Sequence, residues 1–225
     1  LGYVRLKLST TLEDAADREL PDSDSGYRTA DALIQDIESM YQALCAAGAA
    51  NIADSLLLPF LREVSVFRFS TVRLDIRENT LRINQTLAEL YRRQQGADAP
   101  ATDSEEWKRW ILSELATPRS ATRKYLDLSN EARETLDTFR VIAELRQTID
   151  REAFGALILS MTHSATDVLG VYLLAKEAGL YADSAGMEGC TLPVVPLLET
   201  IPDLRRAPAI LRELLAVPVV QRSLA

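Results

Sequence analysis

The last third of the chain alternates short apolar runs with helical patterns, and this order constrains the fold more than any other sequence feature. Residues 156–161 and 192–198 are apolar runs of the kind found in strands buried on both faces. Each run precedes a helical pattern, over 168–177 and 201–216. A strand–helix–strand–helix order implies parallel strands joined by right-handed crossovers. We therefore predict part of an α/β sheet or barrel here.

The first two thirds are mostly helical in pattern, with one strand. Alternating aliphatic and polar residues predict a strand over 71–77, with 66–69 as its lead-in. Thr166 or Asp167 is the expected cap of the 168–177 helix. We expect an N-terminal helix that ends near Glu19, followed by helices over 30–50, 53–64 and 81–93. A further helix should begin after a cap at Asp103 or Ser104, and another should cover 128–149 with Ser129 as its cap.

Composition excludes several classes of protein. The 225 residues include 25 Lys+Arg and 33 Asp+Glu, a formal net charge of −8, which argues against broad binding of nucleic acid or anionic membranes. The sequence contains no run of about 18 apolar residues, so no transmembrane helix is expected. Two cysteines and no C-x-x-C pair give neither a disulfide framework nor a zinc site, so a reducing cytoplasm is expected. The absent initiator Met suggests a piece of something longer.

Polar residues follow three of the predicted strands, in segments 75–80, 160–163 and 196–200. In a (β/α) barrel the carboxyl ends of the strands carry the active site, so Arg77 and Glu199 are a candidate anion-plus-metal pair. Two simpler roles compete. Arg77 suits a salt-bridged arginine at a barrel rim, and Glu199 suits a helix N-terminus, where the dipole favours a carboxylate. Spacing alone favours these simpler roles.

Four ordered segments resemble the phosphoenolpyruvate carboxylase family. Residues 72–77 (V-R-L-D-I-R) are similar to its V-R-x-D-I-R strand, and 136–144 to its L-D-T-x-x-V-I-A-E helix. Residues 160–169 and 176–179 resemble its S-M-x-x-x-x-S-D-V-L and K-E-A-G segments, and 196–204 its P-L-F-E-T-I-x-D-L. Four matches in order are more specific than any one of them. The first seventy residues agree only in helical character.

The resemblance implies a mostly α fold with a few parallel strands, part of a helix-rich (β/α)8 TIM-type barrel. A helical segment over 1–70 would precede a partial barrel segment over 71–225. The implied enzyme is a cytoplasmic lyase, a tetramer, that condenses phosphoenolpyruvate with bicarbonate, using Mg²⁺ or Mn²⁺. Its products are oxaloacetate and phosphate, which links it to carbon dioxide fixation and the tricarboxylic acid cycle.

Two site residues carry over from the resemblance. Arg77 matches the family's arginine that holds the substrate phosphate, and a guanidinium can bind a phosphoryl group bidentately. Glu199 matches one of two carboxylates that bind the metal. A hard divalent cation takes oxygen ligands and stabilises the enolate that forms when phosphate leaves.

Departures from the family pattern oppose full activity. Glu78 replaces the usual Gln, and its charge would oppose an anion nearby. The family's R-H-T becomes Arg82-Ile83-Asn84, and the phenylalanine of P-L-F-E-T becomes Leu198. The T-A-H-P-T-E segment with the catalytic histidine, the G-Y-S-D-S segment with the second metal carboxylate, and the glycine- and arginine-rich loop are absent. We expect the isolated chain to be inactive; the alternative is a degenerate carboxylase-like helical module with a structural or interaction role.

His163, the only histidine, follows a predicted strand and could titrate near neutrality as a base. The family's catalytic histidine belongs to an absent motif, so an ordinary loop or supporting imidazole is favoured. Cys190 has no partner base and is expected to be a thiol outside any disulfide. Trp107 and Trp110, three residues apart, predict packing in the core. Arg205, Arg206 and Arg212 predict a solvated helix face, with a regulatory anion site as the weaker alternative.

Overall fold

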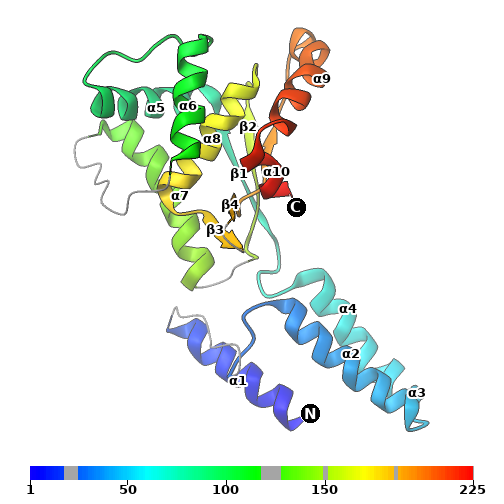
Figure 1. Cartoon of the computed structure of the whole chain (residues 1–225). Coiled ribbons are helices and arrows are strands. Elements are labelled where there is room, and N and C mark those ends of the chain that lie inside the picture. Colours follow the sequence, from blue (N-terminus) through cyan, green and yellow to red (C-terminus); the bar gives the residue numbers. More distant parts are fainter. Residues whose placement is uncertain (18–24, 118–127, 149–151, 185–186, 225) are drawn as a thin grey trace. The chain divides into compact units, whose positions relative to one another are not determined.

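The computed structural model describes residues 1–17, 25–117, 128–148, 152–184 and 187–224 (Figure 1). The chain forms two compact units. Leu1–Leu74 and Glu144–Phe154 make up the first unit; Asp75–Ala143 and Gly155–Ala225 make up the second. Most of the described residues are helical. No described helix combines the length and apolar character needed to cross a membrane.

Helices pack around a small core in the first unit. They are α1 (Gly2–Ala16), α2 (Ala30–Ala46), α3 (Ala50–Ile52), the π-helical turn η1 (Ala53–Leu57) and α4 (Leu58–Phe67). Apolar side chains at helical spacing bury Leu33 and Ile37 of α2 against Val4 of α1 and Val64 of α4. The predicted helix over 30–50 is confirmed, and Gly48 follows it at φ +75°. The expected end of the first helix near Glu19 lies outside the described residues.

Pro59 explains the irregular helix between α2 and β1. It lacks an N–H, so it cannot donate to the carbonyl one turn earlier, and the π-helical turn η1 ends two residues before it. Residues 66 and 67 continue α4, which ends where Arg68 adopts φ 55°. The predicted lead-in to a strand over 66–69 is therefore wrong: residues 66 and 67 are the last residues of α4, and a turn follows.

The second unit is built on a three-stranded sheet of order β1-β2-β5. Its strands are β1 (Leu74–Asn79), β2 (Phe154–Ser160) and β5 (Val194–Pro196). β2 and β5 are parallel, with Leu157 opposite Val194. The predicted parallel arrangement is confirmed for this pair. The predicted strand over 71–77 begins three residues later than expected.

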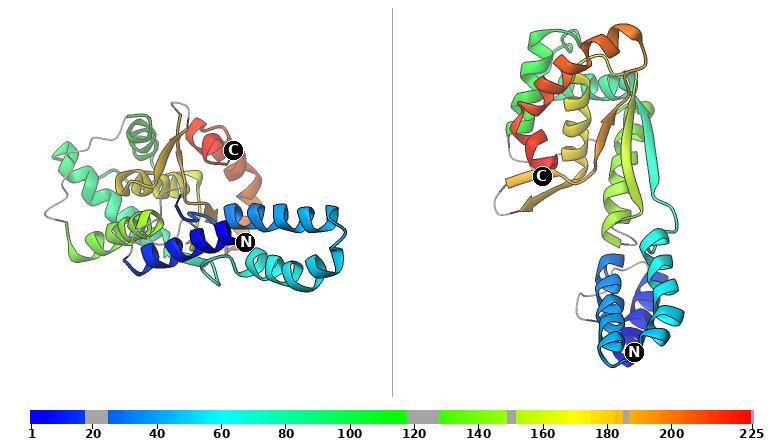
Figure 2. Two further views of the ribbon diagram at one scale, coloured as in Figure 1. Left: turned by 90° about the horizontal axis from the view of Figure 1, so that it is seen from below. Right: turned by 90° about the vertical axis from the view of Figure 1, so that its right-hand side faces the viewer.

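Helix α8 (Ala165–Ala178) is buried over its whole length, because it contacts α5 (Thr80–Gln95), α6 (Glu105–Ala116), α9 (Ile201–Leu215) and β5 (Figure 2). Gly170 allows the close approach of α5: a Cβ there would lie 2.8 Å from Leu87 Cδ1. Ser164, not Thr166 or Asp167, caps α8, and its hydroxyl accepts from the Asp167 N–H while the Asp167 carboxylate accepts from the Ser164 N–H. The cap was predicted too late in the chain.

The remaining predicted helices are present. Ser104 caps α6 as expected, and the Ser129 hydroxyl accepts from the Ala132 N–H at the start of α7 (Asn130–Thr148). Trp107 and Trp110 are buried with ring centroids 4.9 Å apart, which confirms their packing in the core.

Two elements were not predicted. An antiparallel hairpin, β3 (Tyr181–Ser184) and β4 (Met187–Cys190), follows α8, and α10 (Pro218–Leu224) packs against β4. The Cys190 thiol donates to the Leu192 carbonyl at 3.4 Å. The fold is therefore mostly α with a small parallel sheet. A closed barrel is not shown in the part of the chain that the structure describes.

Candidate functional site

The carboxyl end of β1 brings Arg77 to the edge of the sheet. β1 is tied to β2 by side chains as well as by strand pairing: the Asp75 carboxylate accepts from the Ala156 N–H at 2.8 Å, and the Ser160 hydroxyl donates to the Glu78 carbonyl at 3.0 Å. These contacts fix the strand that carries Arg77. Its guanidinium donates to Glu199 Oε1 at 2.9 Å, while the arginine side chain stays 64% exposed.

Glu199 is held from two sides. Oε1 accepts from Arg77, and Oε2 accepts from the Met161 N–H at 3.3 Å. Met161 follows β2 and has φ +57°, a left-handed backbone that residues with a side chain rarely adopt. The Thr162 N–H also donates to the Leu197 carbonyl at 3.2 Å. The ends of all three strands thus meet at one carboxylate.

His163 faces a different carboxylate. Its Nδ1 lies 3.0 Å from Oδ1 of Asp203, whose side chain is 2% exposed, and Arg206 donates to the same oxygen at 2.7 Å. The Thr200 hydroxyl, then His163 and Arg206, hold the pKa of Asp203 well below its usual range. His163 therefore links the end of β2 to the first turn of α9.

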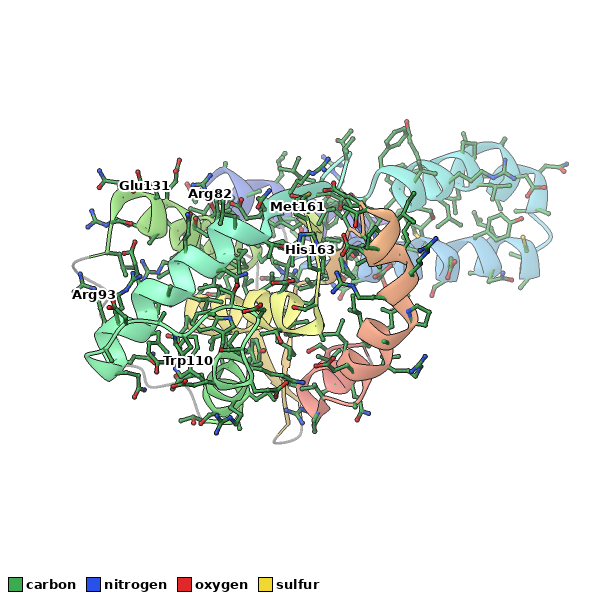
Figure 3. The ribbon with its side chains drawn as sticks, turned by 90° about the horizontal axis from the view of Figure 1, so that it is seen from above. Arg82, Arg93, Trp110, Glu131, Met161 and His163 are labelled. Carbon is green, nitrogen blue, oxygen red and sulfur yellow. The ribbon has the colours of Figure 1, made fainter. Side chains whose placement is uncertain are left out.

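A cleft of about 730 Å³ opens where α5, α6 and α8 begin. Met161 and His163, which Figure 3 labels, lie on its wall, together with Lys108, Arg206 and Glu213. Lys108 of α6 and Glu213 of α9 pair at 2.6 Å, which raises the pKa of the lysine. Neither Arg77 nor Glu199 lines this cleft, so their pair lies outside it.

The described residues do not make a divalent-cation site by themselves. They contain no group of three or more His, Cys, Asp or Glu side chains able to hold a metal ion. Both oxygens of Glu199 already accept hydrogen bonds, and Mg²⁺ demands nearly ideal octahedral oxygen geometry. Glu199 could supply one ligand of a site whose other ligands lie elsewhere.

Comparison with known proteins decides the family. The model of a family described as phosphoenolpyruvate carboxylase matches residues 1–225. The chain belongs to the phosphoenolpyruvate carboxylase family. It is 49% identical to the phosphoenolpyruvate carboxylase of Methylorubrum extorquens over 99% of its length, and 37% identical to that of Medicago sativa over 96%. It spans only 24% and 22% of those two proteins.

Family membership confirms the resemblance that the sequence segments indicated. Arg77 and Glu199, which the family pattern singles out, lie in contact, while His163 contacts neither of them by any described hydrogen bond. Arg206 pairs with Asp203, and the chain leaves Arg205 and Arg212 exposed, as expected of a solvated helix face.

The sequence did not single out Asp203 or the Met161 N–H. Thr200 and Asp203 form a T-x-x-D pattern, which signals a helix start and could have located the carboxylate. Met161 belongs to the S-M segment that resembles the family, but its residue type does not reveal that its backbone N–H donates to Glu199, because that depends on the backbone conformation. The Glu78 carboxylate accepts a hydrogen bond from the neighbouring Asn79 N–H at 2.7 Å.

Proposed function

We propose that this chain is part of a phosphoenolpyruvate carboxylase, which condenses phosphoenolpyruvate with bicarbonate and releases oxaloacetate and phosphate. The observation that carries the proposal is the meeting of Arg77 and Glu199, 2.9 Å apart, at the ends of β1 and β5. The family pattern assigns these two residues to the substrate phosphate and to the metal. Family membership over the whole chain supports the assignment.

Arg77 would bind the phosphoryl group through paired N–H donors, which suits its planar guanidinium. Mg²⁺ or Mn²⁺ is the proposed cofactor, and when bound it would supply electrostatic stabilisation of the enolate. Glu199 would give it one oxygen ligand. Because the described residues contain no group of three or more His, Cys, Asp or Glu side chains able to hold a metal ion, we expect the isolated chain to be inactive.

The finer architecture also belongs to this proposal. The sheet β1-β2-β5 would be part of a (β/α)8 barrel, within a tetrameric cytoplasmic enzyme that serves carbon dioxide fixation and the tricarboxylic acid cycle. The parallel β2–β5 pair with α8 between them in the sequence supports the barrel, since this is its repeating unit.

Arg77→Ala in the full-length parent tests the function. We expect phosphate release from phosphoenolpyruvate, dependent on bicarbonate and a divalent cation, to be abolished. The matched control is Arg92→Ala, since Arg92 is also an exposed arginine with an acidic partner, Asp98 at 3.3 Å, but lies in the last turn of α5. Normal turnover by Arg77→Ala would remove Arg77 from the substrate site. A parent without any such turnover would favour the alternative, a helical interaction module.

A further inference from the structure

We infer that Arg77 and Glu199 mask each other: Glu199 occupies the guanidinium of Arg77 and so competes with any phosphate that binds there. The inference rests on the proposed function only for the phosphate as ligand. The contact itself is a property of the fold: the two side chains come from β1 and from the segment after β5, and they meet at 2.9 Å.

Glu199 is positioned for this role before any anion arrives. Its Oε2 accepts from the Met161 N–H, so one oxygen is anchored to the backbone while the other faces Arg77. Anchoring restricts the rotamers of the glutamate, and less side-chain entropy is then lost when the ion pair forms. Its side chain is 29% exposed, against 64% for Arg77.

The masking is expected to be modest in size. An exposed ion pair contributes on the order of 0.2–1 kcal/mol in water, which corresponds to roughly a 1.4- to 5-fold change in a binding constant. Phosphate would have to displace a carboxylate that already satisfies the guanidinium. Removing the charge of Glu199 should therefore tighten phosphate binding at Arg77 by roughly 1.4- to 5-fold.

A second ion pair offers a matched control. Arg82 of α5 and Glu134 of α7 lie 2.8 Å apart, and Glu134 is 72% exposed. Glu134→Gln changes the net charge by the same amount as Glu199→Gln, at a different arginine. It separates release of Arg77 from a general loss of negative charge.

The experiment is a titration of the 225-residue chain with inorganic phosphate at constant ionic strength, followed by NMR of the arginine Nε–Hε groups. Wild type, Glu199→Gln, Glu134→Gln and the double variant Arg77→Gln/Glu199→Gln are compared. Amide spectra report whether each variant is folded. The side-chain amide introduced by Glu199→Gln keeps an oxygen that can accept from the Met161 N–H, which favours a preserved backbone.

We expect the Arg77 signal to shift between wild type and Glu199→Gln without phosphate, and to respond to phosphate at a roughly 1.4- to 5-fold lower concentration in the variant. Glu134→Gln should leave the Arg77 response as in wild type. Equal phosphate affinity of Arg77 in wild type and Glu199→Gln would overturn the inference, as would no response in either. So would an equal gain in Glu134→Gln, or tighter overall binding that persists in the double variant.

Failure here and failure of the proposed function are distinguishable. Turnover by the full-length parent tests whether Arg77 holds the substrate, whereas the titration tests whether Glu199 competes for Arg77 in this chain. Suppose that the full-length parent is active, that its Arg77→Ala variant is inactive, and that wild type and Glu199→Gln bind phosphate equally well. The proposed function would then stand, and the masking of Arg77 by Glu199 would be refuted.

Discussion

At the scale of single residues, the site depends on an uncommon backbone conformation. Met161 has φ +57°, which costs a residue with a Cβ on the order of 1 kcal/mol or more. This conformation follows directly after β2 and places the Met161 N–H 3.3 Å from Glu199 Oε2. A strained residue thus orients the carboxylate that also pairs with Arg77.

Glycine should therefore be preferred to alanine at position 161. We expect Met161→Gly to be more stable than Met161→Ala by about 1 kcal/mol, because glycine adopts positive φ without a Cβ penalty. Urea unfolding of both variants measures the difference. In helix α2 the order should reverse, with Met40→Gly less stable than Met40→Ala by about 0.5–1 kcal/mol. A Met161→Ala variant at least as stable as Met161→Gly would show that Met161 is not strained.

The pH dependence of stability should report Asp203. The pKa of its carboxyl is lowered in the folded chain by the Thr200 hydroxyl, His163 and Arg206. A lowered folded pKa stabilises the fold above the unfolded value, about 3.9, and this contribution is lost as the pH falls below it. We expect Asp203→Asn to flatten the acid limb of the stability curve below about pH 4. Parallel acid limbs in wild type and variant would contradict this.

Sequence patterns located Arg77 and Glu199 but not their contact. Each lies in a recognisable motif, yet the two are far apart in the chain, and only the pairing of β1, β2 and β5 brings them together. Asp203 and Met161 were missed for related reasons. A pKa lowered by neighbouring side chains and a positive φ are both products of the folded environment.

At the scale of elements, α6 ends on a buried lysine of another helix. Lys176 of α8 is 2% exposed, and its ammonium donates to the carbonyls of Glu114 and Leu115 at 2.7 and 2.9 Å, and to that of Thr117. These carbonyls lie at the C-terminal end of α6, where the last carbonyls have no N–H donors within the helix. The K-E-A-G segment therefore joins two helices.

Lys176→Met should lower the free energy of unfolding by about 2 kcal/mol or more. Methionine keeps much of the volume but leaves buried carbonyls without a donor, and hydrogen bonds to a charged group contribute about 1.5–3 kcal/mol. Lys108→Met in α6 is the control, since it removes only the partly exposed pair with Glu213 and should cost at most about 1 kcal/mol. Equal losses measured by urea unfolding would argue against the capping role.

Element prediction was accurate where periodicity is strong and failed where polar residues decide. Helices α5 and α7 and the parallel strands follow from apolar spacing. The sequence pattern favoured Thr166 or Asp167 as the cap of α8, but Ser164 is also a suitable cap by type, and its reciprocal hydrogen bonds with Asp167 place the start of the helix there. The β3–β4 hairpin has no alternating apolar pattern; it is held by pairing of Tyr181 with Cys190 and by α10.

At the scale of the whole chain, the described residues do not form a complete metal site. The chain covers 24% of its Methylorubrum extorquens relative, and its described residues hold no cluster of metal-ligating side chains. One oxygen of Glu199 is also paired with Arg77. Metal affinity should thus depend on segments outside this chain.

We expect the isolated chain not to bind Mn²⁺ with micromolar affinity. One carboxylate with two hydrogen-bonded oxygens provides too few ligands for a tight site. Isothermal titration calorimetry with Mn²⁺ measures this, and Glu199→Gln should give the same weak response as wild type. Micromolar binding that Glu199→Gln abolishes would contradict the prediction.

The missing methyl group at Gly170 has a consequence beyond packing. Leu87 fills the space where a Cβ would lie, so the spacing of α5 and α8 is set by the absence of one carbon atom. α5 begins three residues after Arg77, and α8 begins four residues after Met161, which anchors Glu199. A Cβ at position 170 would require the end of the Leu87 side chain to shift, because the two atoms would lie only 2.8 Å apart. The close approach at Gly170 therefore packs together the two helices that follow the Arg77 strand and the Met161 turn in the sequence.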